Sequence, residues 1–93
     1  MIKNIPCKET KKIWEGKWSH KLPQDIQQTA RRKLRMLNNA KTLDDLRIPP
    51  NNRLEKLTGN RDGQYSIRIN IQWRICFQWH EGIVSNVEII DYH

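Results

Sequence analysis

The sequence predicts an α+β domain in which N-terminal helices pack on one face of a mainly antiparallel C-terminal β-sheet. Two observations lead to this prediction. The last third of the chain alternates apolar and polar side chains and holds most of the aromatic residues, which is typical of half-buried strands. Residues 23–39 instead repeat apolar side chains at helical spacing. With 93 residues, the chain is expected to form one domain, residues 1–93, around a single core.

The N-terminal segment is expected to begin with a short strand over residues 2–5, which Pro6 ends. Residues 7–15 are predicted to form a short helix, because Gly16 stands where a glycine commonly terminates a helix. Two side chains of this helix are expected to face inward, Ile13 and Trp14.

A basic and aromatic connector follows at residues 17–21. An exposed indole beside lysines can stack on a nucleic-acid base. An indole can equally hold a loop in place by packing on the core. We interpret Trp18 as such a packing anchor.

The long helix is predicted over residues 23–39, because Pro23 suits a first helical turn and apolar side chains recur three or four residues apart after it. Its buried face is expected to hold Ile26, Ala30, Leu34 and Leu37. The other faces carry a cationic run made of Arg31, Arg32, Lys33 and Arg35. This run is expected to follow a phosphate backbone or to bind an acidic partner, and the alternative is a solvated helix face.

Three signals mark the passage from the long helix to the sheet. Residues 42–45 have the spacing of a capping box, with Asp in place of the usual Glu, and predict a short helix that the Pro-Pro pair at 49–50 ends. A short strand is possible at residues 54–57. Residues 58–63 are rich in Gly, Asn and Asp and predict a turn.

Three strands are predicted in the C-terminal third, over residues 64–70, 73–79 and 84–90. The apolar density of the third run indicates a central strand that is buried on both faces. Alternation places Arg68 and Arg74 on polar strand faces. The third strand then delivers the last three residues to the rim of the sheet, namely Asp91, Tyr92 and His93.

Composition narrows the classes of function. The net charge of +7 lies outside the nearly neutral C-terminal third and favours a polyanionic partner, although a merely soluble basic protein is the alternative.

No segment has the apolar length of a membrane span or the apolar core of a signal peptide, so a cytoplasmic protein is expected. The chain has neither a GxGxxG nor a Walker loop, and no cofactor is expected. Cys7, Cys76 and three scattered histidines predict neither a disulfide framework nor a metal site.

Three stretches carry a resemblance to a known family, namely RLEKLTGNRDGQYSIRIN, QWRICFQW and the terminal VEIIDYH. Nearly the whole chain resembles the HigB-type toxins of the RelE/ParE superfamily, also called plasmid maintenance killer proteins. The resemblance implies a RelE-like fold and a ribosome-dependent, metal-independent endoribonuclease that cleaves translated messenger RNA in the ribosomal A site. It also implies a HigA-like helix-turn-helix antitoxin as a partner, and through it an indirect link to operator DNA. On this reading, the cationic run of the long helix binds the ribosome or the antitoxin.

The resemblance also assigns site residues. Arg74 matches the phosphate clamp of the family motif, a role that suits a planar guanidinium. Asp91, Tyr92 and His93 match the active-site end of the chain, with His93 or Asp91 as the proton-transfer group and Tyr92 orienting or stacking on a base. Without the resemblance, Arg74 reads as a surface ion pair and the last three residues as a frayed tail.

The sequence departs from one HigB pattern, which has a His just before the sheet and a Lys ahead of the following Gly. Glu55 and Thr58 stand at these places, so the identity of the base is open and Glu55 is a candidate for it. Further RNA contacts are expected from Arg53, Lys56, Arg61 and Arg68, with Lys56 on the opposite strand face from Glu55. Two other functions remain open. A ParE-like toxin would poison DNA gyrase by protein contact, with Asp91 and His93 dispensable, and a non-catalytic module would only bind RNA.

Overall fold

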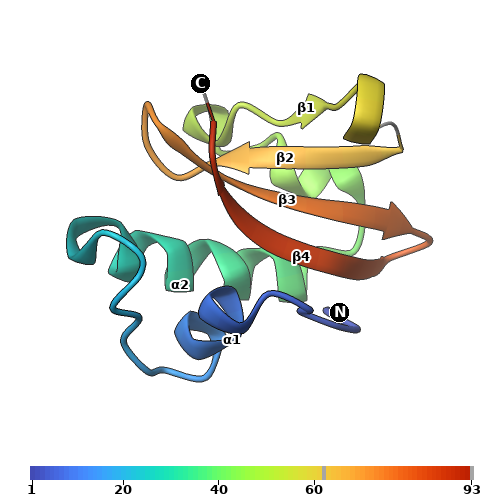
Figure 1. Cartoon of the computed structure of the whole chain (residues 1–93). Coiled ribbons are helices and arrows are strands. Elements are labelled where there is room, and N and C mark those ends of the chain that lie inside the picture. Colours follow the sequence, from blue (N-terminus) through green and yellow to red (C-terminus); the bar gives the residue numbers. More distant parts are fainter. Residues whose placement is uncertain (62, 93) are drawn as a thin grey trace.

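The computed structural model describes residues 1–61 and 63–92 and confirms the predicted α+β class. In this part of the chain, two α-helices lie on one face of a four-stranded antiparallel sheet (Figure 1). The helices are α1 (Lys8–Trp14) and α2 (Gln24–Asn39), and short 3-10 helices lie at Leu43–Leu46, Pro50–Asn52 and Gly59–Arg61. Across the sheet, the strands keep the order of the sequence: β1 (Glu55–Lys56), β2 (Gln64–Arg68), β3 (Trp73–His80) and β4 (Ile83–Asp91).

The helix α2 supplies most of the helical side of the core. It begins directly after Pro23, as predicted. Its four predicted core residues are at most 2% exposed, namely Ile26, Ala30, Leu34 and Leu37. They belong to one buried cluster with Ile67, Ile75 and Phe77 of the sheet. Since burying a large apolar side chain contributes about 1.5 to 3 kcal/mol, this interface stabilises the arrangement of the two layers.

The strands β2 and β3 alternate as predicted, with one face toward the helices and one face away from them. The register pairs Ser66 with Cys76 and Arg68 with Arg74. Directly paired residues point to the same face of a sheet, so these four side chains lie together on the face turned away from α1 and α2.

The strand β4 lies at the edge of the sheet, so the prediction of a central strand is wrong. The N-terminal part of the chain covers this edge. Ile2 makes a single parallel bridge to Val84, and the Ile89 backbone N–H donates to Thr10 Oγ1 at 2.9 Å. The strand predicted at residues 2–5 is thereby reduced to one bridge. These contacts explain why β4 is rich in apolar residues although no fifth full strand covers it among the described residues.

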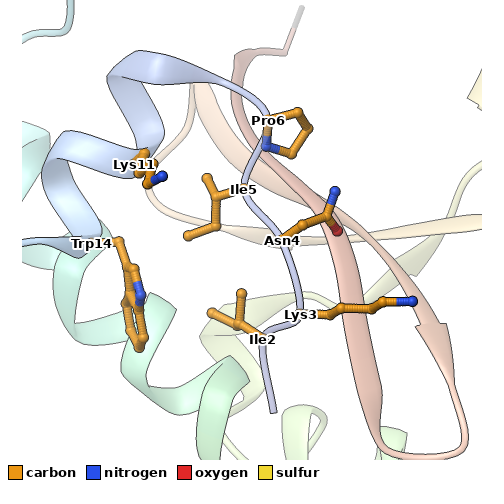
Figure 2. Close-up of a pocket in the computed structure, with 7 residues that line it drawn as sticks. All are labelled: Ile2, Lys3, Asn4, Ile5, Pro6, Lys11 and Trp14. Carbon is orange, nitrogen blue, oxygen red and sulfur yellow. The ribbon is translucent and has the colours of Figure 1, made fainter.

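The N-terminal segment packs its apolar side chains against α1. Figure 2 shows Ile2 and Ile5 pointing toward Trp14, while Lys3 points the other way. The segment and α1 together line a groove of about 320 Å³. The predicted inward position of Ile13 is confirmed, since this residue is fully buried, and Trp14 is half-buried beside it.

The link from α2 to the sheet contains the predicted capping box. The Asp45 N–H donates to Thr42 Oγ1 at 3.3 Å, and the Thr42 N–H donates to Asp45 Oδ2 at 3.1 Å. These bonds begin the 3-10 helix Leu43–Leu46. The strand predicted at residues 54–57 is confirmed in a shorter form, because only Glu55–Lys56 pair with β2 as a strand.

Two predictions about surface residues are wrong. Trp18, expected to anchor its loop, is 55% exposed, and its neighbour Ser19 is buried instead. Lys33, expected in the exposed cationic run, is 3% exposed because it reaches under the sheet, where its Nζ donates to the Arg68 carbonyl. Within residues 1–61 and 63–92, neither α-helix combines the length and the apolar character needed to cross a membrane.

Candidate functional site

Arg74 lies at the centre of a polar cluster on the sheet face turned away from the helices. The sequence predicted a surface position, but the residue is only 5% exposed because neighbouring groups enclose its guanidinium. Nε donates to Ser66 Oγ at 2.7 Å, and Nη2 donates to the carbonyl oxygens of Arg53 and Ser66. The N–H groups of Nη1 have no hydrogen-bond acceptor among the described residues. Arg74 is thus fixed by the protein while one edge remains for an oxyanion.

Tyr92 lies over this guanidinium and connects it to Glu55. The ring centre is 5.3 Å from Arg74 Cζ, within cation–π range. The hydroxyl donates to Glu55 Oε2 at 3.1 Å, and this hydrogen bond and the glutamate charge raise the pKa of Tyr92. The phenol therefore stays protonated at neutral pH. Because the Tyr92 backbone N–H also donates to the Gln72 carbonyl at 2.6 Å, the chain does not fray before this residue.

Glu55 reaches the cluster because of the strand register. The strand β1 pairs Glu55 with Ser66, which puts the carboxylate on the same face as Arg74. Lys56 pairs with Tyr65 and starts from the opposite face, as predicted. The path of β4 completes the arrangement, since its end rises past β3 and β2 toward the start of β1 (Figure 1).

Further predicted RNA contacts lie close to Arg74. Arg53 has a left-handed backbone with φ of 44°, and its carbonyl accepts from Arg74 while its side chain is exposed. Arg68 is paired directly with Arg74 across β2 and β3. Two cations on paired positions of one face repel each other. A bound phosphate would relieve this repulsion, so the pair favours an anionic ligand.

A shallow depression of about 320 Å³ adjoins the cluster. Beside the apolar Leu57 and Ile90, its lining includes five predicted site residues, namely Glu55, Lys56, Arg61, Asp91 and Tyr92. Arg61 Nη1 is held by Glu88 Oε1 at 3.0 Å. The depression therefore combines apolar surface with a few charged groups, as ligand sites commonly do.

One predicted member of the site, Asp91, stands apart from this cluster. Asp91 pairs with Trp73, so its side chain starts from the opposite face of the sheet to that of Arg74. Its Oδ2 accepts from Gln72 Nε2 at 3.0 Å. It nevertheless contributes to the border of the depression. His93 lies outside the residues that the structure describes, so its role remains a prediction.

The cationic run of α2 is divided between different surroundings. Arg31 donates to the carbonyls of Ile13 at 3.0 Å and Lys17 at 3.1 Å, which caps the end of α1. Lys33 is buried, as described above. Arg32 and Arg35 remain exposed on the helical layer, on the other side of the sheet from Arg74. Of the four residues, Arg32 and Arg35 are therefore the two whose side chains are exposed for a partner.

Sequence reasoning missed two parts of the Arg74 environment. Ser66 lies on the same polar face of the sheet as Arg74. Its hydrogen bond with Arg74, however, depends on how β2 and β3 are aligned in the hairpin. The position of the Arg53 carbonyl depends on the left-handed backbone of this arginine, and nothing in that residue type predicts such a conformation.

For metals, residues 1–61 and 63–92 contain no group of three or more His, Cys, Asp or Glu arranged to hold an ion.

The cluster brings together three kinds of chemistry. A carboxylate can accept a proton, and a protonated phenol can donate a hydrogen bond to orient it. A preorganised guanidinium can stabilise negative charge that develops on a phosphate. These are groups that transesterification at phosphorus requires.

Comparisons with known proteins identify the family. The model of the family described as RelE-like toxin of the type II toxin-antitoxin system HigB matches residues 7–93. Toxin HigB-1 of Vibrio cholerae is 45% identical over 75 residues, which are 80% of this chain and 79% of that protein. An uncharacterized protein of Haemophilus influenzae is 35% identical over 72 residues, which are 77% of this chain and 71% of that protein.

A solved structure shares the fold. The YoeB-YefM complex from Staphylococcus aureus contains a chain that superimposes with a TM-score of 0.56 at 17% identity, covering 100% of this chain and 95% of that one. At this low identity the likeness concerns the fold alone. The family match and the HigB-1 relative carry the assignment: this chain belongs to the family of RelE-like toxins of the type II toxin-antitoxin system HigB.

Proposed function

We propose that this toxin is a ribosome-dependent endoribonuclease that cleaves translated messenger RNA in the ribosomal A site. Membership in the HigB family supports the toxin role. The observation that carries the catalytic part is the cluster of Arg74, Tyr92 and Glu55, in which a fixed cation lies against the Tyr92 ring and the Tyr92 hydroxyl donates to the Glu55 carboxylate.

In the proposed reaction, Glu55 takes the proton of a ribose 2′-hydroxyl, and the freed oxygen attacks the adjacent phosphorus. Arg74 neutralises the charge that builds on the nonbridging oxygens. The bond to the 5′-oxygen breaks, and this oxygen receives a proton from His93 or Asp91, the two predicted proton-transfer groups. The products are a 2′,3′-cyclic phosphate and a 5′-hydroxyl. Side chains carry every proton transfer, so the chemical step is expected to be independent of metal ions.

The shape of the site supports the proposed ribosome dependence. The depression is shallow, and Glu55 and Tyr92 at its border are exposed. Such a site offers few contacts to offset the entropy lost when a flexible RNA strand binds. A ribosome that already holds the messenger in an extended form removes much of this cost. It therefore supplies substrate positioning that the toxin lacks.

The proposed partners and location follow from the same function. A HigA-like helix-turn-helix antitoxin would neutralise the toxin and would link it indirectly to operator DNA. A toxin that acts on translating ribosomes works in the cytoplasm. Co-purification of the toxin with the product of a neighbouring helix-turn-helix gene tests this part, and a failure to form a complex contradicts it.

The cleavage proposal is tested with purified toxin, translating ribosomes and a defined messenger, by mapping new 5′ ends. Cuts confined to the A-site codon are the expected result. A separate arm uses concentrated toxin and model RNA in chelator, because ribosomes themselves need magnesium. Activity that returns only with one added metal would overturn the metal-independent chemistry. Intact messenger together with inhibited gyrase would replace the proposal with the ParE-like function.

A further inference from the structure

An exposed tryptophan lies on the helical layer, away from the Arg74 cluster. Trp18 is 55% exposed, and Arg31 lies over its ring with Cζ 5.8 Å from the centre. Among the described residues of the connector 17–21 and of α2, it is the one large apolar side chain that is exposed. This surface therefore lacks the group of exposed apolar side chains that forms the centre of most protein interfaces.

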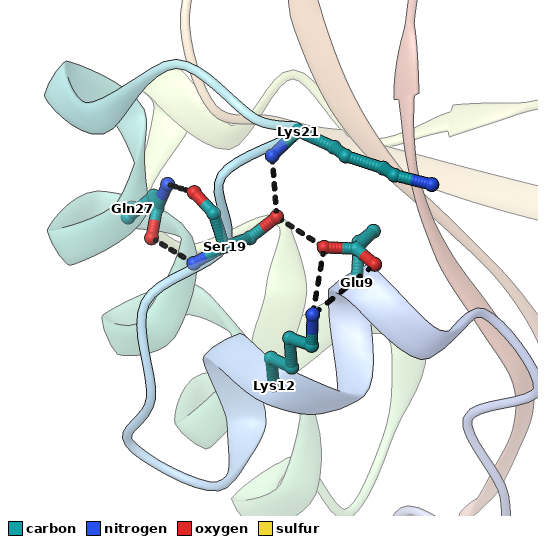
Figure 3. Close-up of polar contacts among 5 residues, drawn as sticks. All are labelled: Glu9, Lys12, Ser19, Lys21 and Gln27. Carbon is teal, nitrogen blue, oxygen red and sulfur yellow. Dashed lines mark hydrogen bonds and ion pairs between the residues drawn. The ribbon is translucent and has the colours of Figure 1, made fainter.

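The backbone on both sides of Trp18 is fixed. Arg31 Nη2 donates to the Lys17 carbonyl at 3.1 Å. On the other side, the Ser19 N–H donates to Gln27 Oε1 at 3.0 Å, and Gln27 Nε2 returns a bond to the Ser19 carbonyl at 2.7 Å (Figure 3). Ser19 Oγ further donates to Glu9 of α1. The connector is therefore a rigid support, so holding the indole on the surface costs little additional entropy when a ligand binds.

Cations continue from the indole along α2. At about 100° per residue, Arg32 and Arg35 lie within roughly a quarter turn of Arg31. Both are exposed, and with Gln28 and Thr29 they line a second hollow of about 320 Å³. Residues 15–35 carry six Lys and Arg against two acids. One acid, Glu15, is already paired with Lys17 at 3.6 Å.

An aromatic face beside fixed cations has the chemistry of a nucleic-acid contact, with the ring stacking on a base and the arginines neutralising phosphates. We propose that Trp18, with Arg31, Arg32 and Arg35, forms a docking platform for ribosomal RNA. This inference rests on the proposed ribosome-dependent function. Ribosomal RNA is favoured over messenger RNA because the sheet and the helical layer separate the platform from the Arg74 cluster (Figure 1).

The test measures the affinity of the toxin for purified bacterial 70S ribosomes by co-sedimentation, with and without bound messenger. Trp18→Ala is expected to weaken binding about five- to a hundredfold in both cases, the range of one lost base stack. Trp18→Phe keeps an aromatic face and should restore most of the affinity. The control Ile48→Ala truncates another exposed apolar residue and should bind as the wild type does.

Several results would overturn the platform. Unchanged affinity of Trp18→Ala excludes the stack, and equal losses in the Phe and Ala variants exclude an aromatic requirement. An effect seen only with messenger assigns Trp18 to the substrate, and a loss of antitoxin binding with normal ribosome affinity assigns it to the partner protein. An unfolded Trp18→Ala would show a packing role instead. Because the arm without messenger measures ribosome affinity without any cleavage, absence of RNA cleavage in the wild type counts against the proposed function alone.

Discussion

Two arginines of this toxin are held in the same way on opposite layers of the fold. Each donates hydrogen bonds to two backbone carbonyls and lies against an aromatic ring, with Tyr92 5.3 Å from Arg74 and Trp18 5.8 Å from Arg31. The two pairs differ in the group that lies next to the aromatic ring. The Tyr92 hydroxyl leads on to the Glu55 carboxylate, whereas Trp18 faces solvent.

The comparison teaches that an arginine–aromatic pair is a scaffold whose use depends on what adjoins it. An adjacent carboxylate adds a group that can move a proton, so the Arg74 cluster can support chemistry. The Trp18 pair has only cations and a π-face, so it can support binding.

The largest expected effect is that of Arg74→Ala. Loss of a preorganised cation should slow cleavage about a hundred- to a thousandfold. Because Arg74 is 5% exposed and satisfies Ser66 and Arg53, the variant should also lose about 2 to 3 kcal/mol of unfolding free energy. Urea unfolding and cleavage rates check both effects. Nearly unchanged stability would contradict the buried geometry of Arg74.

A matched variant separates charge from geometry at this position. Arg74→Lys keeps the cation but loses the planar fork that reaches three acceptors. Cleavage close to the wild-type rate would mean that charge alone suffices, which contradicts a positioned clamp.

The second effect concerns the carboxylate. Glu55→Gln keeps the shape of the side chain and an acceptor for Tyr92 but removes the base, so cleavage should fall about a hundredfold. Tyr92→Phe should have a smaller effect, because it keeps the ring over Arg74 and loses only the hydroxyl. Deletion of His93 should abolish cleavage with little change in stability. If Glu55→Gln retains full activity while the His93 deletion does not, the base lies elsewhere.

The third effect concerns Lys33, which lies between the two layers. Burial lowers the pKa of Lys33 to about 8, helped by the charges of Arg32, Arg68 and Arg74. Between about pH 8 and 10.5 the unfolded chain therefore binds more protons at this residue than the folded chain does. Its contribution to stability should rise with pH across this window, by up to about 3 kcal/mol.

Comparison with Lys33→Met isolates that contribution. Burial raises the pKa of Cys76 to about 11, so the contribution of Cys76 to stability falls with pH between about pH 9 and 11. This contribution is the same in the wild type and in the variant, so it cancels in the comparison. The difference in unfolding free energy between wild type and variant should change with pH from 8 to 10.5. If this difference in unfolding free energy does not change with pH, folding does not lower the pKa of Lys33.

The smallest effect is expected from Arg32→Gln with Arg35→Gln. Removal of two phosphate contacts should reduce the slope of log affinity against log salt by about 1 to 2 in ribosome binding. Arg47→Gln removes an exposed arginine that is paired with Asp44 at 3.3 Å and serves as the control. An unchanged slope in the double variant would remove the cations of α2 from the docking platform.

The fold was predictable where one local pattern decides the outcome. The apolar spacing from Ile26 to Leu37 predicts α2, and alternation around Ser66 and Arg74 predicts which side chains share a face. The position of β4 was not predictable in this way. Its apolar residues are covered by the N-terminal segment and α1. An apolar strand has the same sequence pattern whether another strand or a different element covers it.

The site was predictable in its residues more than in its geometry. The resemblance singles out Arg74 and Tyr92, and the structure brings them together with Glu55. Burial of Arg74 depends on the left-handed Arg53 and on the hairpin register, which no single-residue preference reports. Likewise, exposure of Trp18 follows from Ser19 taking the buried position, a choice between neighbours that composition does not resolve.

The central claim is that catalysis and ribosome docking are separate functions of the two arginine–aromatic pairs. Single-turnover cleavage of ribosome-bound messenger over a range of ribosome concentrations tests it directly, with Arg74→Ala and Trp18→Ala beside the wild type. Arg74→Ala should reach a rate at saturation about a hundredfold or more below the wild type, with an unchanged half-saturation concentration. Trp18→Ala should reach the wild-type rate at a raised half-saturation concentration. The account is contradicted if Trp18→Ala lowers the saturated rate or if Arg74→Ala changes only the half-saturation concentration.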